Sequence, residues 1–509
     1  MIESVVLPTD RGGWWHNYIC PAHGTELVHV GLETGDFPTD GAPCPAGCRI
    51  DTPNVRGAWT VLAHRECARR ILDAARHGSS AEQRQAAALL EQYADLYHAL
   101  PAEHGEAPAW MLRGRLFHQG LTEAIWAVTI AQATWELVEK EVSVAASVFR
   151  LLDSLAAAAQ AGREVLVKEG RFTSNYIAWI NAAGACCTRD PVWLTGELGM
   201  FNHLVAATGE DGWQWEASTY YHSFVLRAAH AALAALPDVQ PPELLRSRLA
   251  AMRSVLTRLQ TDSGLLPALH DGPYQSADYD AELGELALEP EHRADGVTVF
   301  PNGGYAIVRS HGMHAVIDFG DHGGSHGHRD KLALYLYGPN TAWQPDPGQV
   351  PYGHRGWRAH YASTRSHPAF AVDGLEQAEC GGVLVHHDDN SITVRCDDAY
   401  PGVTATRTIR RTATGLTDEL SLTAAAPRDL TLQLRSAVDL DVRLEDSITT
   451  RWSGKETLHG SHFCTAAAEF MTFPGPGPAD DPRASVSYVD WTAHDVSTAR
   501  FHSDYEMRT

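Results

Sequence analysis

Hydrophobic residues recur at helical spacing through most of the first half of the chain. Between about residues 58 and 260, Ala- and Leu-rich segments place apolar residues three to four positions apart, and Gly, Pro or Asp separates the segments. This pattern predicts helices over residues 81–97, 112–135, 141–159, 175–188, 192–208, 220–236 and 242–259. Short loops between so many helices favour antiparallel hairpins arranged around a centre. The expected architecture is an α/α toroid, complete or incomplete.

In the second half of the chain the period changes to two residues. Residues 304–310 and 313–319 flank a Gly-containing turn, which predicts a β-hairpin. Further strands are predicted over residues 331–337, 369–373, 382–386, 392–396, 402–411, 416–424 and 430–437. Their short lengths and turn residues favour an antiparallel β-sandwich.

Helices followed by strands indicate separate domains rather than one mixed sheet. The expected division is an N-terminal segment over residues 1–57, the toroid over residues 58–290 and the sandwich over residues 291–509. A ligand site is expected in the cleft between the two larger domains.

Composition and charge exclude several classes of function. The chain has 509 residues, 44% of them hydrophobic, and no apolar run long enough to span a membrane. Its start lacks the pattern of a secretory signal, so the expected location is the cytoplasm. A formal net charge of -23 disfavours nucleic acid or an anionic membrane as a partner. An anionic ligand would therefore need a local cluster of Arg, His or metal. Association into a homo-oligomer is left open.

The spacing of cysteines near the start predicts a metal site. Cys20 precedes His23 by three positions, Cys44 precedes Cys48 by four, and the two pairs lie about twenty residues apart, as in the two knuckles of a tetrahedral zinc site. A Pro- and Gly-rich segment of this size buries too little surface to fold by itself. We expect a structural zinc ribbon; the alternative is four unconnected residues in a long loop. An odd total of nine cysteines does not suggest a disulfide framework.

Residues 318–330 hold the densest group of chemically active side chains. This stretch contains three histidines, three carboxylates and four glycines within thirteen residues, and a predicted strand follows it. If residues 326–330 are extended, His326, His328 and Asp330 share one face. The alternative is a solvated polar loop. Downstream, Asp346 and His367 supply a further carboxylate and imidazole, so that a zinc site becomes possible.

Two segments of the helical half also carry candidate chemistry. Asn175 and Tyr176 open one predicted helix, and residues 211–222 open another with two Trp, two Tyr and a His beside acidic residues. The second segment suits stacking on a sugar and hydrogen bonding to it. The alternative is helix capping, by Asn175 or Ser218, and packing.

In this order the motifs resemble the heparinase II/III-type polysaccharide lyases, which include alginate and oligoalginate lyases. The resemblance covers roughly residues 170–375. It rests on Asp-Gly-x3-Glu-x-Ser-x2-Tyr-His from Asp211, His-x-His-x-Asp-x-Leu from His326, Asp-x-Gly from Asp346, and Arg-Ser-His from Arg365. It implies an α/α toroid followed by an antiparallel β-sandwich.

The resemblance also implies roles for individual residues. Asn175 matches the residue that neutralises the substrate carboxylate, and Tyr221 matches the catalytic tyrosine. His326 matches the active-site histidine, and Tyr352 matches a tyrosine that lines the cleft. The implied zinc ligands are His328, Asp346 and His367. Substrate-binding residues are expected among Tyr176, Trp213, Glu216, Tyr220, His222 and Arg365, with Tyr220 as an alternative to Tyr221 in catalysis. The chain departs from many members at Tyr176 and at Leu434–Arg435, where they have histidine.

The expected function is therefore β-elimination on a uronic-acid-containing glycan. Asn175 and His326 would neutralise the carboxylate, Tyr221 would act as acid or as both acid and base, and His326 or Tyr352 would share the role of base. The alternatives are a toroid glycoside hydrolase that uses Asp211 and Glu216, and a non-catalytic sugar-binding protein. A cytoplasmic location favours short imported oligosaccharides. The glycan class, endo or exo action, and zinc or calcium as the metal remain open.

Overall fold

The chain divides into two compact units, each described by itself. The computed structural model describes residues 2–101, 111–275, 277–288, 294–444 and 448–508. Unit 1 consists of Met1–Ala207, Phe224–Arg246 and Pro351–His354, and unit 2 consists of Thr208–Ser223, Ser247–Val350 and Arg355–Thr509. These boundaries differ from the predicted linear division at residues 58 and 291. The chain crosses between the units several times, which a pattern of local periods does not reveal.

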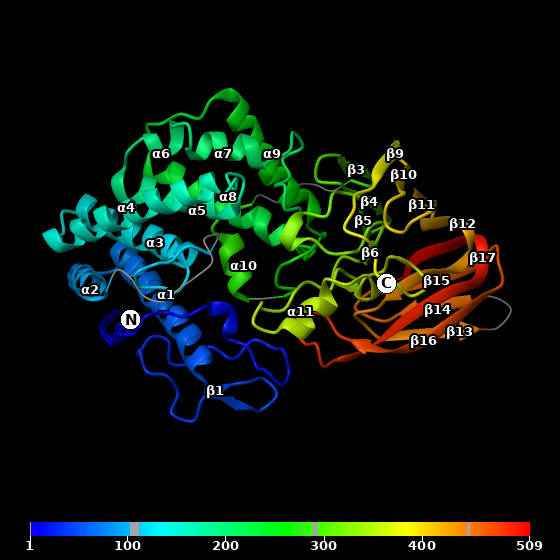
Figure 1. Cartoon of the computed structure of the whole chain (residues 1–509), viewed down its shortest axis with the longest axis horizontal. Coiled ribbons are helices and arrows are strands. Elements are labelled where there is room, and N and C mark those ends of the chain that lie inside the picture. Colours follow the sequence, from blue (N-terminus) through cyan, green and yellow to red (C-terminus); the bar gives the residue numbers. More distant parts are fainter. Residues whose placement is uncertain (1, 102–110, 276, 289–293, 445–447, 509) are drawn as a thin grey trace. The chain divides into compact units, whose positions relative to one another are not determined.

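The helices form two layers in unit 1. They are α1 (Pro53–His77), α2 (Ser80–Ala99), α3 (Gly120–Glu139), α4 (Ala146–Lys168), α5 (Asn175–Thr188), α6 (Val192–Thr195) and α7 (Met200–Ala207). Helix α8 (Thr219–Ala235) begins in unit 2 and ends in unit 1, α9 (Glu243–Leu259) begins in unit 1 and ends in unit 2, and α10 (Ala277–Gly284) belongs to unit 2. Helix α3 packs against α1 and α5, while α2 and α4 pack against each other and against α1 and α5 respectively. This layering of antiparallel helices confirms the predicted toroid architecture (Figure 1).

Local sequence explains where several helices begin. The side chain of Thr52 accepts a hydrogen bond from the Val55 amide, with Pro53 as the first helical residue, and Ser79 forms a capping box with Glu82 at α2. The predicted helix over residues 192–208 is two helices, because the chain between them turns at Gly196 and Gly199, whose amides donate to the Val192 and Gly196 carbonyls.

Unit 2 contains a five-stranded antiparallel sheet in the order β3 (Gly296–Phe300), β4 (Tyr305–Ser310), β5 (Met313–Asp318), β6 (Leu334–Tyr337) and β7 (Ala342–Gln344). The predicted hairpin is confirmed as β4 and β5, in which Ser310 pairs with Met313. The predicted strand over residues 331–337 begins only at Leu334. Leu332 has a φ of 59° and lies in a turn, a conformation that no strand residue adopts.

A ten-stranded antiparallel sheet completes unit 2. Its strands are β8 (Phe370–Val372), β9 (Val383–His387), β10 (Ser391–Cys396), β11 (Val403–Arg411), β12 (Gly415–Arg435), β13 (Leu440–Leu444), β14 (Ile448–Trp452), β15 (Thr457–Cys464), β16 (Ala468–Pro476) and β17 (Ser485–Arg508). Strands β13, β14, β15, β17, β12, β11, β10 and β9 lie in that order, with β16 beside β17 and β8 beside β12 (Figure 1). The predicted strands over residues 416–424 and 430–437 are one strand, β12, with register shifts between Thr423 and Leu430.

The five-stranded sheet is buried on both faces. Ala306, Val308, Leu334 and Leu336 share a core with Ile392, Leu420 and Trp491 of the larger sheet. The alternate residues Tyr305, Tyr335 and Tyr337 pack with Trp213 and Leu269 on the opposite face. The predicted sandwich is therefore confirmed, and its second face carries the segments around Trp213 and Leu269.

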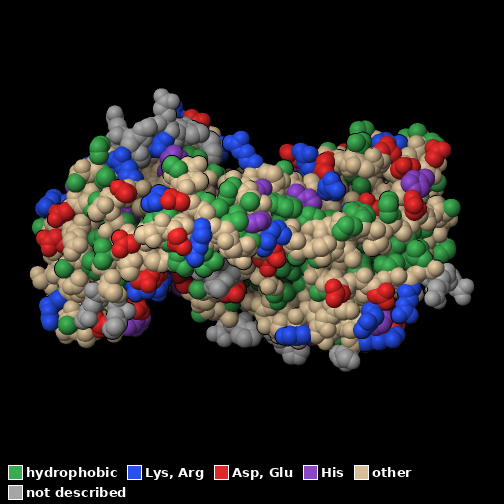
Figure 2. Space-filling view, turned by 90° about the horizontal axis from the view of Figure 1, so that it is seen from below, with side chains coloured by type: hydrophobic (Ala, Val, Ile, Leu, Met, Phe, Trp, Pro, Cys, Tyr) green, Lys and Arg blue, Asp and Glu red, His purple; other side chains and the backbone are tan. Residues whose placement is uncertain are grey.

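Smaller elements complete the structure. They are the 3-10 turns Ile2–Ser4, Trp15–Asn17, Gly324–His326 and Thr364–Ser366, the two-stranded sheet of β1 (Ala42–Pro43) and β2 (Arg49–Ile50), and α11 (Arg355–Tyr361). Within the described residues, no helix combines the length and apolar character needed to cross a membrane. On the face shown in Figure 2, acidic and basic side chains are interspersed rather than gathered into one patch.

Candidate active site

The start of α8 brings Tyr221 against the histidine-rich loop within unit 2. Ser218 caps the helix: its Oγ accepts a hydrogen bond from the Tyr221 amide at 3.2 Å and donates to the Asp271 carbonyl at 2.5 Å. The Tyr221 ring stacks on the His326 imidazole, with ring centroids 3.6 Å apart and an interplanar angle of 22°. Two residues that the sequence assigned to one site, from segments a hundred positions apart, are therefore in contact.

Asp271 is the central acceptor of the site, and sequence reasoning missed it. Its carboxylate accepts hydrogen bonds from His326 Nδ1 at 3.0 Å and from His328 Nε2 at 3.2 Å, and pairs with the Arg358 guanidinium at 2.9 Å. Burial raises the pKa of Asp271, but hydrogen bonds from both histidines and the charge of Arg358 outweigh it and hold the pKa well below its usual range. The only signal in the sequence is a His-Asp-Gly run in a stretch without periodicity.

Glu216 and Trp215 also lie beside His326. Glu216 Oε1 is 3.7 Å from His326 Nε2, and Gln214 holds the Glu216 side chain through its amide at 3.0 Å. A Cβ built on Gly324 of the loop would lie 3.3 Å from the Trp215 ring, and this ring is 44% exposed. Trp215 is thus the exposed aromatic residue of the segment, although the sequence had indicated Trp213.

Backbone strain marks the same region. Ala217 and His270 are non-glycine residues with φ angles of 55° and 59°, in the left-handed region that costs such residues of order 1 kcal/mol or more. They directly follow Glu216 and directly precede Asp271. The strained backbone therefore sets the direction of both carboxylates.

His328, Asp346 and His367 form a buried group that fits a metal ion. Their candidate ligand atoms all lie within 4.8 Å of one another, and all three side chains are fully buried. Within the described part of the chain, His328 Nδ1 has no hydrogen-bond partner, and it lies 4.0 Å from Asp346 Oδ1.

The protonation of this group also suits a cation. Burial lowers the pKa of His367 to about 3, so that its imidazole is neutral. Burial raises the pKa of Asp346 to about 6, and the nearby histidines lower it only in part. Two imidazoles and one carboxylate are a common zinc donor set.

A neighbouring group, His270, Asp318 and Asp330, is similarly compact but already holds its cations. The Lys331 ammonium pairs with Asp318 and lies 3.7 Å from Asp330 Oδ1. Burial lowers the pKa of His270, but Asp330 and Asp318 raise it to about 9 overall, so that the ring is an imidazolium. Two carboxylates thus face two cations. Asp330, expected on one face with the two histidines, belongs to this balanced group and accepts a hydrogen bond from Tyr335 of β6.

The loop itself differs from the extended segment that was expected. Residues Gly324–His326 form a 3-10 turn. His326 and His328 nevertheless converge on one acceptor, Asp271. The two-residue spacing therefore predicted correctly that both histidines point to one side, although His326 lies in a 3-10 turn and not in an extended segment.

Three predicted residues lie in unit 1. Asn175 is the buried first residue of α5, where Ser174 rather than Asn175 is the cap. The Tyr176 hydroxyl accepts a hydrogen bond from the Gln119 amide. Tyr352 stacks on His16, with ring centroids 4.2 Å apart. These three residues therefore do not belong to the group around His326 that is described within unit 2.

Two residues expected to bind substrate lie instead in the core of unit 2. Trp213 is 1% exposed and His222 is fully buried. His222 accepts a hydrogen bond from the Gln214 amide and donates to the Met252 carbonyl, and burial lowers its pKa to about 4. We therefore assign both residues to packing, because their side chains are buried away from solvent. Tyr220 is partly buried against Tyr279, and Arg365 is exposed.

Asp211 has a structural role. Its carboxylate accepts backbone hydrogen bonds from Trp213 at 3.1 Å, from Asn302 at 2.7 Å and from Gly303 at 3.0 Å. These three backbone donors commit the Asp211 carboxylate to joining the Trp213 segment to the turn at Asn302 and Gly303.

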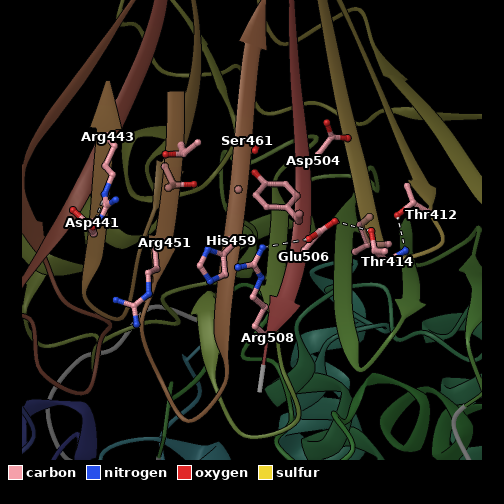
Figure 3. Close-up of a pocket in the computed structure, with 15 residues that line it drawn as sticks. Thr412, Thr414, Asp441, Arg443, Arg451, His459, Ser461, Asp504, Glu506 and Arg508 are labelled. Carbon is pink, nitrogen blue, oxygen red and sulfur yellow. Dashed lines mark hydrogen bonds and ion pairs between the residues drawn. The ribbon is translucent and has the colours of Figure 1, made fainter. Parts of the chain in front are cut away.

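A separate groove of about 640 Å³ lies on the large sheet (Figure 3). It shares no residue with the site around His326. Two of its arginines pair with lining carboxylates: Arg443 lies 3.4 Å from Asp441, and Arg508 lies 3.8 Å from Glu506, which also accepts a hydrogen bond from Thr414. We assign it no ligand, because its lining mixes basic and acidic side chains and does not favour an anionic one.

The four predicted ligands near the start of the chain also come together. The candidate ligand atoms of Cys20, His23, Cys44 and Cys48 lie within 4.8 Å of one another. All nine cysteines of the chain are free thiols in this structure.

Comparison with known proteins agrees with this arrangement. Residues 292–483 match the family model described as Heparinase II/III-like, C-terminal. A sequence search of curated proteins gave no match.

Solved structures with the same fold are heparinases and a heparan sulfate lyase. A heparinase III with methylated lysines has 12% identity and a TM-score of 0.66 over 100% of this chain and 85% of that chain. The heparan sulfate lyase HepC from Pedobacter heparinus has 13% identity and a TM-score of 0.63 over 88% of this chain and 76% of that chain. Residues 292–483 therefore match the heparinase II/III-like C-terminal family, and the chain as a whole shares the fold of these similar structures.

Proposed function

We propose that this protein is a polysaccharide lyase that cleaves a uronic-acid-containing glycan by β-elimination. The observation that carries the proposal is the stack of Tyr221 on His326, whose imidazole is in turn fixed by Asp271. The printed names of the similar structures, heparinase III and heparan sulfate lyase, support a glycosaminoglycan as the first substrate class to test.

The reaction removes the proton at C5, next to the uronate carboxylate, and breaks the bond between C4 and the glycosidic oxygen. The electron pair left at C5 forms the C4–C5 double bond, and the leaving oxygen takes a proton. Catalysis therefore needs a base near C5, a proton donor near the glycosidic oxygen, and stabilisation of the enolate-like transition state. We assign the proton donor to the Tyr221 hydroxyl, and the proton taken from C5 then returns to the tyrosinate and regenerates the hydroxyl.

His326 is suited to act on the substrate carboxylate or as the base. Its Nδ1 donates to Asp271, which fixes the ring orientation and leaves Nε2 directed to the side of Glu216. An imidazolium held between two carboxylates would neutralise the uronate, and a neutral ring would present Nε2 as a base. Asn175 and Tyr352 of unit 1 are proposed, from the family resemblance, to neutralise the carboxylate and to share the role of base.

Zinc is the proposed ion for His328, Asp346 and His367. When bound, it would supply a fixed positive charge that anchors these three side chains. His328 belongs to the same loop as His326, and Asp271 contacts both rings. The ligands therefore hold the loop that carries His326 while the proton transfers are left to Tyr221 and His326.

Trp215 is the proposed stacking surface for a sugar ring. Its indole is exposed beside the His326 loop, and pyranose faces pack well against exposed aromatic rings.

Two other functions are less well supported. A toroid glycoside hydrolase would need Asp211 and Glu216 as its carboxylate pair, but backbone amides occupy Asp211. A sugar-binding protein without activity would not need a tyrosine stacked on an oriented histidine.

Incubation with heparan sulfate, chondroitin sulfate and alginate oligosaccharides separates the three functions. A lyase produces the ultraviolet absorbance of an unsaturated uronate together with new reducing ends. New reducing ends without that absorbance would indicate a hydrolase, and binding without either product would indicate a sugar-binding protein.

A further inference from the structure

The cysteine-containing segment of unit 1 has the internal distances of a metal site. The Sγ atoms of Cys20, Cys44 and Cys48 lie 3.3, 3.4 and 3.6 Å from His23 Nδ1. Around a tetrahedral zinc ion with Zn–S near 2.3 Å and Zn–N near 2.0 Å, sulfur and nitrogen ligands are about 3.5 Å apart. The four side chains are therefore already at ligand spacing.

Two tight turns present these ligands. The Gly24 amide donates to the Cys20 carbonyl at 2.8 Å, and the Gly47 amide donates to the Cys44 carbonyl at 2.8 Å. Both glycines have left-handed φ angles, 72° and 89°, which residues with a side chain rarely adopt. The Ala46 amide also donates to Cys44 Sγ at 3.4 Å, which would stabilise a thiolate.

The segment has little else to hold it together. Its regular structure consists of β1 and β2, each two residues long. A small hydrophobic cluster joins Tyr18 and Leu27 of the segment to Trp59 of α1. Cys20 and Cys44 lie inside that cluster. Three thiolates with one imidazole select a soft, tetrahedral ion, and four protein ligands leave no position for a substrate.

The residues just before Cys20 contact Tyr352. His16, four residues before Cys20, stacks on the Tyr352 ring at an interplanar angle of 15°. The Gly353 amide donates to the His16 carbonyl at 3.1 Å. Two hydrogen bonds fix Tyr18, which lies between His16 and Cys20. The Leu27 amide donates to the Tyr18 carbonyl, and the Tyr18 hydroxyl donates to the Val28 carbonyl.

We propose that Cys20, His23, Cys44 and Cys48 bind one structural zinc ion, and that this ion fixes the segment Trp14–Cys20 against which Tyr352 is stacked. Zinc would act on Tyr352 only as a positioning element, through His16. The proposed metal site does not depend on the proposed lyase function. Its effect on catalysis through Tyr352 does rest on that function.

Cobalt titration of the metal-depleted full chain tests the binding site. Co²⁺ bound by thiolates gives sulfur-to-cobalt charge-transfer absorbance in the near ultraviolet, which the cysteine-free group at His328 cannot give. We expect one equivalent with this absorbance in the wild type and in Cys464→Ser, a half-buried thiol of β15, and loss of it in Cys44→Ser. Equal thiolate absorbance in wild type and Cys44→Ser would overturn the metal site, as would its absence from the wild type.

Hydrogen exchange measured by mass spectrometry tests the link to Tyr352. Removal of the ion from the wild type with a chelator should speed exchange in peptides covering residues 14–28 and 351–354, and addition of Zn²⁺ should restore the slow exchange. This comparison uses the wild-type chain, so it does not depend on the folding of a variant. Faster exchange at residues 14–28 alone would keep the metal site and overturn the positioning of Tyr352. Both measurements are independent of lyase turnover, so they separate failure of this proposal from failure of the proposed function.

Discussion

At the scale of single residues, Asp271 orients two histidines of one loop in different directions. It accepts from His326 Nδ1 and from His328 Nε2. His326 is left with Nε2 on the side of Glu216, and His328 is left with Nδ1 on the side of Asp346. Because each imidazole offers two nitrogens, the shared acceptor leaves the second nitrogen of each ring facing a different carboxylate, and the proposed division between reaction and metal rests on this difference.

Replacement of Tyr221 by Phe tests the proposed proton donor. The change removes the hydroxyl and keeps the ring that stacks on His326. We expect kcat to fall by about two orders of magnitude or more, with KM little changed, in the ultraviolet assay. Tyr220→Phe is the matched control, and a larger loss there would move the proton donor to Tyr220.

Replacement of Trp215 by Ala tests the proposed stacking surface. The exposed indole contributes binding rather than proton transfer, so we expect KM to rise by about tenfold with kcat largely retained. Steady-state kinetics on the best substrate measures both constants. An unchanged KM would remove Trp215 from the binding surface.

Replacement of His328 by Ala tests the second metal site. The change removes one of three buried ligands, so we expect the protein to lose one equivalent of zinc in elemental analysis. His322→Ala, in the same loop but outside the ligand group, is the control. Metal content equal to that of the wild type would contradict the assignment.

At the scale of elements, the N-terminus of α8 connects helix formation with the site. Ser218 Oγ satisfies the Tyr221 amide and binds the Asp271 carbonyl, so that one cap joins the helix to the segment that carries the central carboxylate. At α2, the capping box of Ser79 and Glu82 is exposed, and its side-chain hydrogen bonds to described residues stay within the box. The two caps are therefore alike in local structure and differ in what they hold.

Comparison of Ser218→Ala with Ser79→Ala separates these roles. Loss of either cap is expected to cost about 1 kcal/mol of stability, measured by denaturant unfolding. Only Ser218→Ala should also lower turnover, because Tyr221 and Asp271 lose their common anchor. Equal turnover in both variants would show that the cap does not position Tyr221.

At the scale of the whole molecule, buried neutral histidines should make the fold sensitive to acid. Burial lowers the pKa of His64, His203 and His222 to about 4 and that of His462 to about 3. An unfolded histidine has a pKa of about 6.5, so between about pH 6.5 and 4 the unfolded chain binds protons that the folded chain does not. Their contribution is complete above about pH 6.5 and is lost as the pH falls.

We therefore expect Tm to decrease as the pH is lowered from about 6.5 to 4, and His462→Gln to reduce that dependence. His494→Gln is the control: its side chain is 54% exposed, and hydrogen bonds from its ring to Asp429 and Glu469 raise rather than lower its pKa. Calorimetry over this pH range checks the slopes. The same acid dependence in His462→Gln as in the wild type would contradict this account.

The sequence determined the features that depend on neighbouring residues. Helical and strand periods gave the toroid and the sandwich, and the short spacings Cys-x2-His and Cys-x3-Cys gave four side chains that do come together. The His-x-His spacing gave two imidazoles that share the acceptor Asp271. The resemblance to the lyase family added Tyr221 beside His326, which the structure confirms as a contact.

Only the tertiary structure decided the features that depend on distant segments. Asp271 reaches His326 across 55 positions of sequence, His16 supports Tyr352, and Trp215 rather than Trp213 is exposed because the facing sheet buries Trp213 beside Tyr305. The units also exchange segments, so linear boundaries did not describe them. Burial and hydrogen-bond partners depend on which surfaces meet after folding, and a local pattern of residues carries no information about that choice.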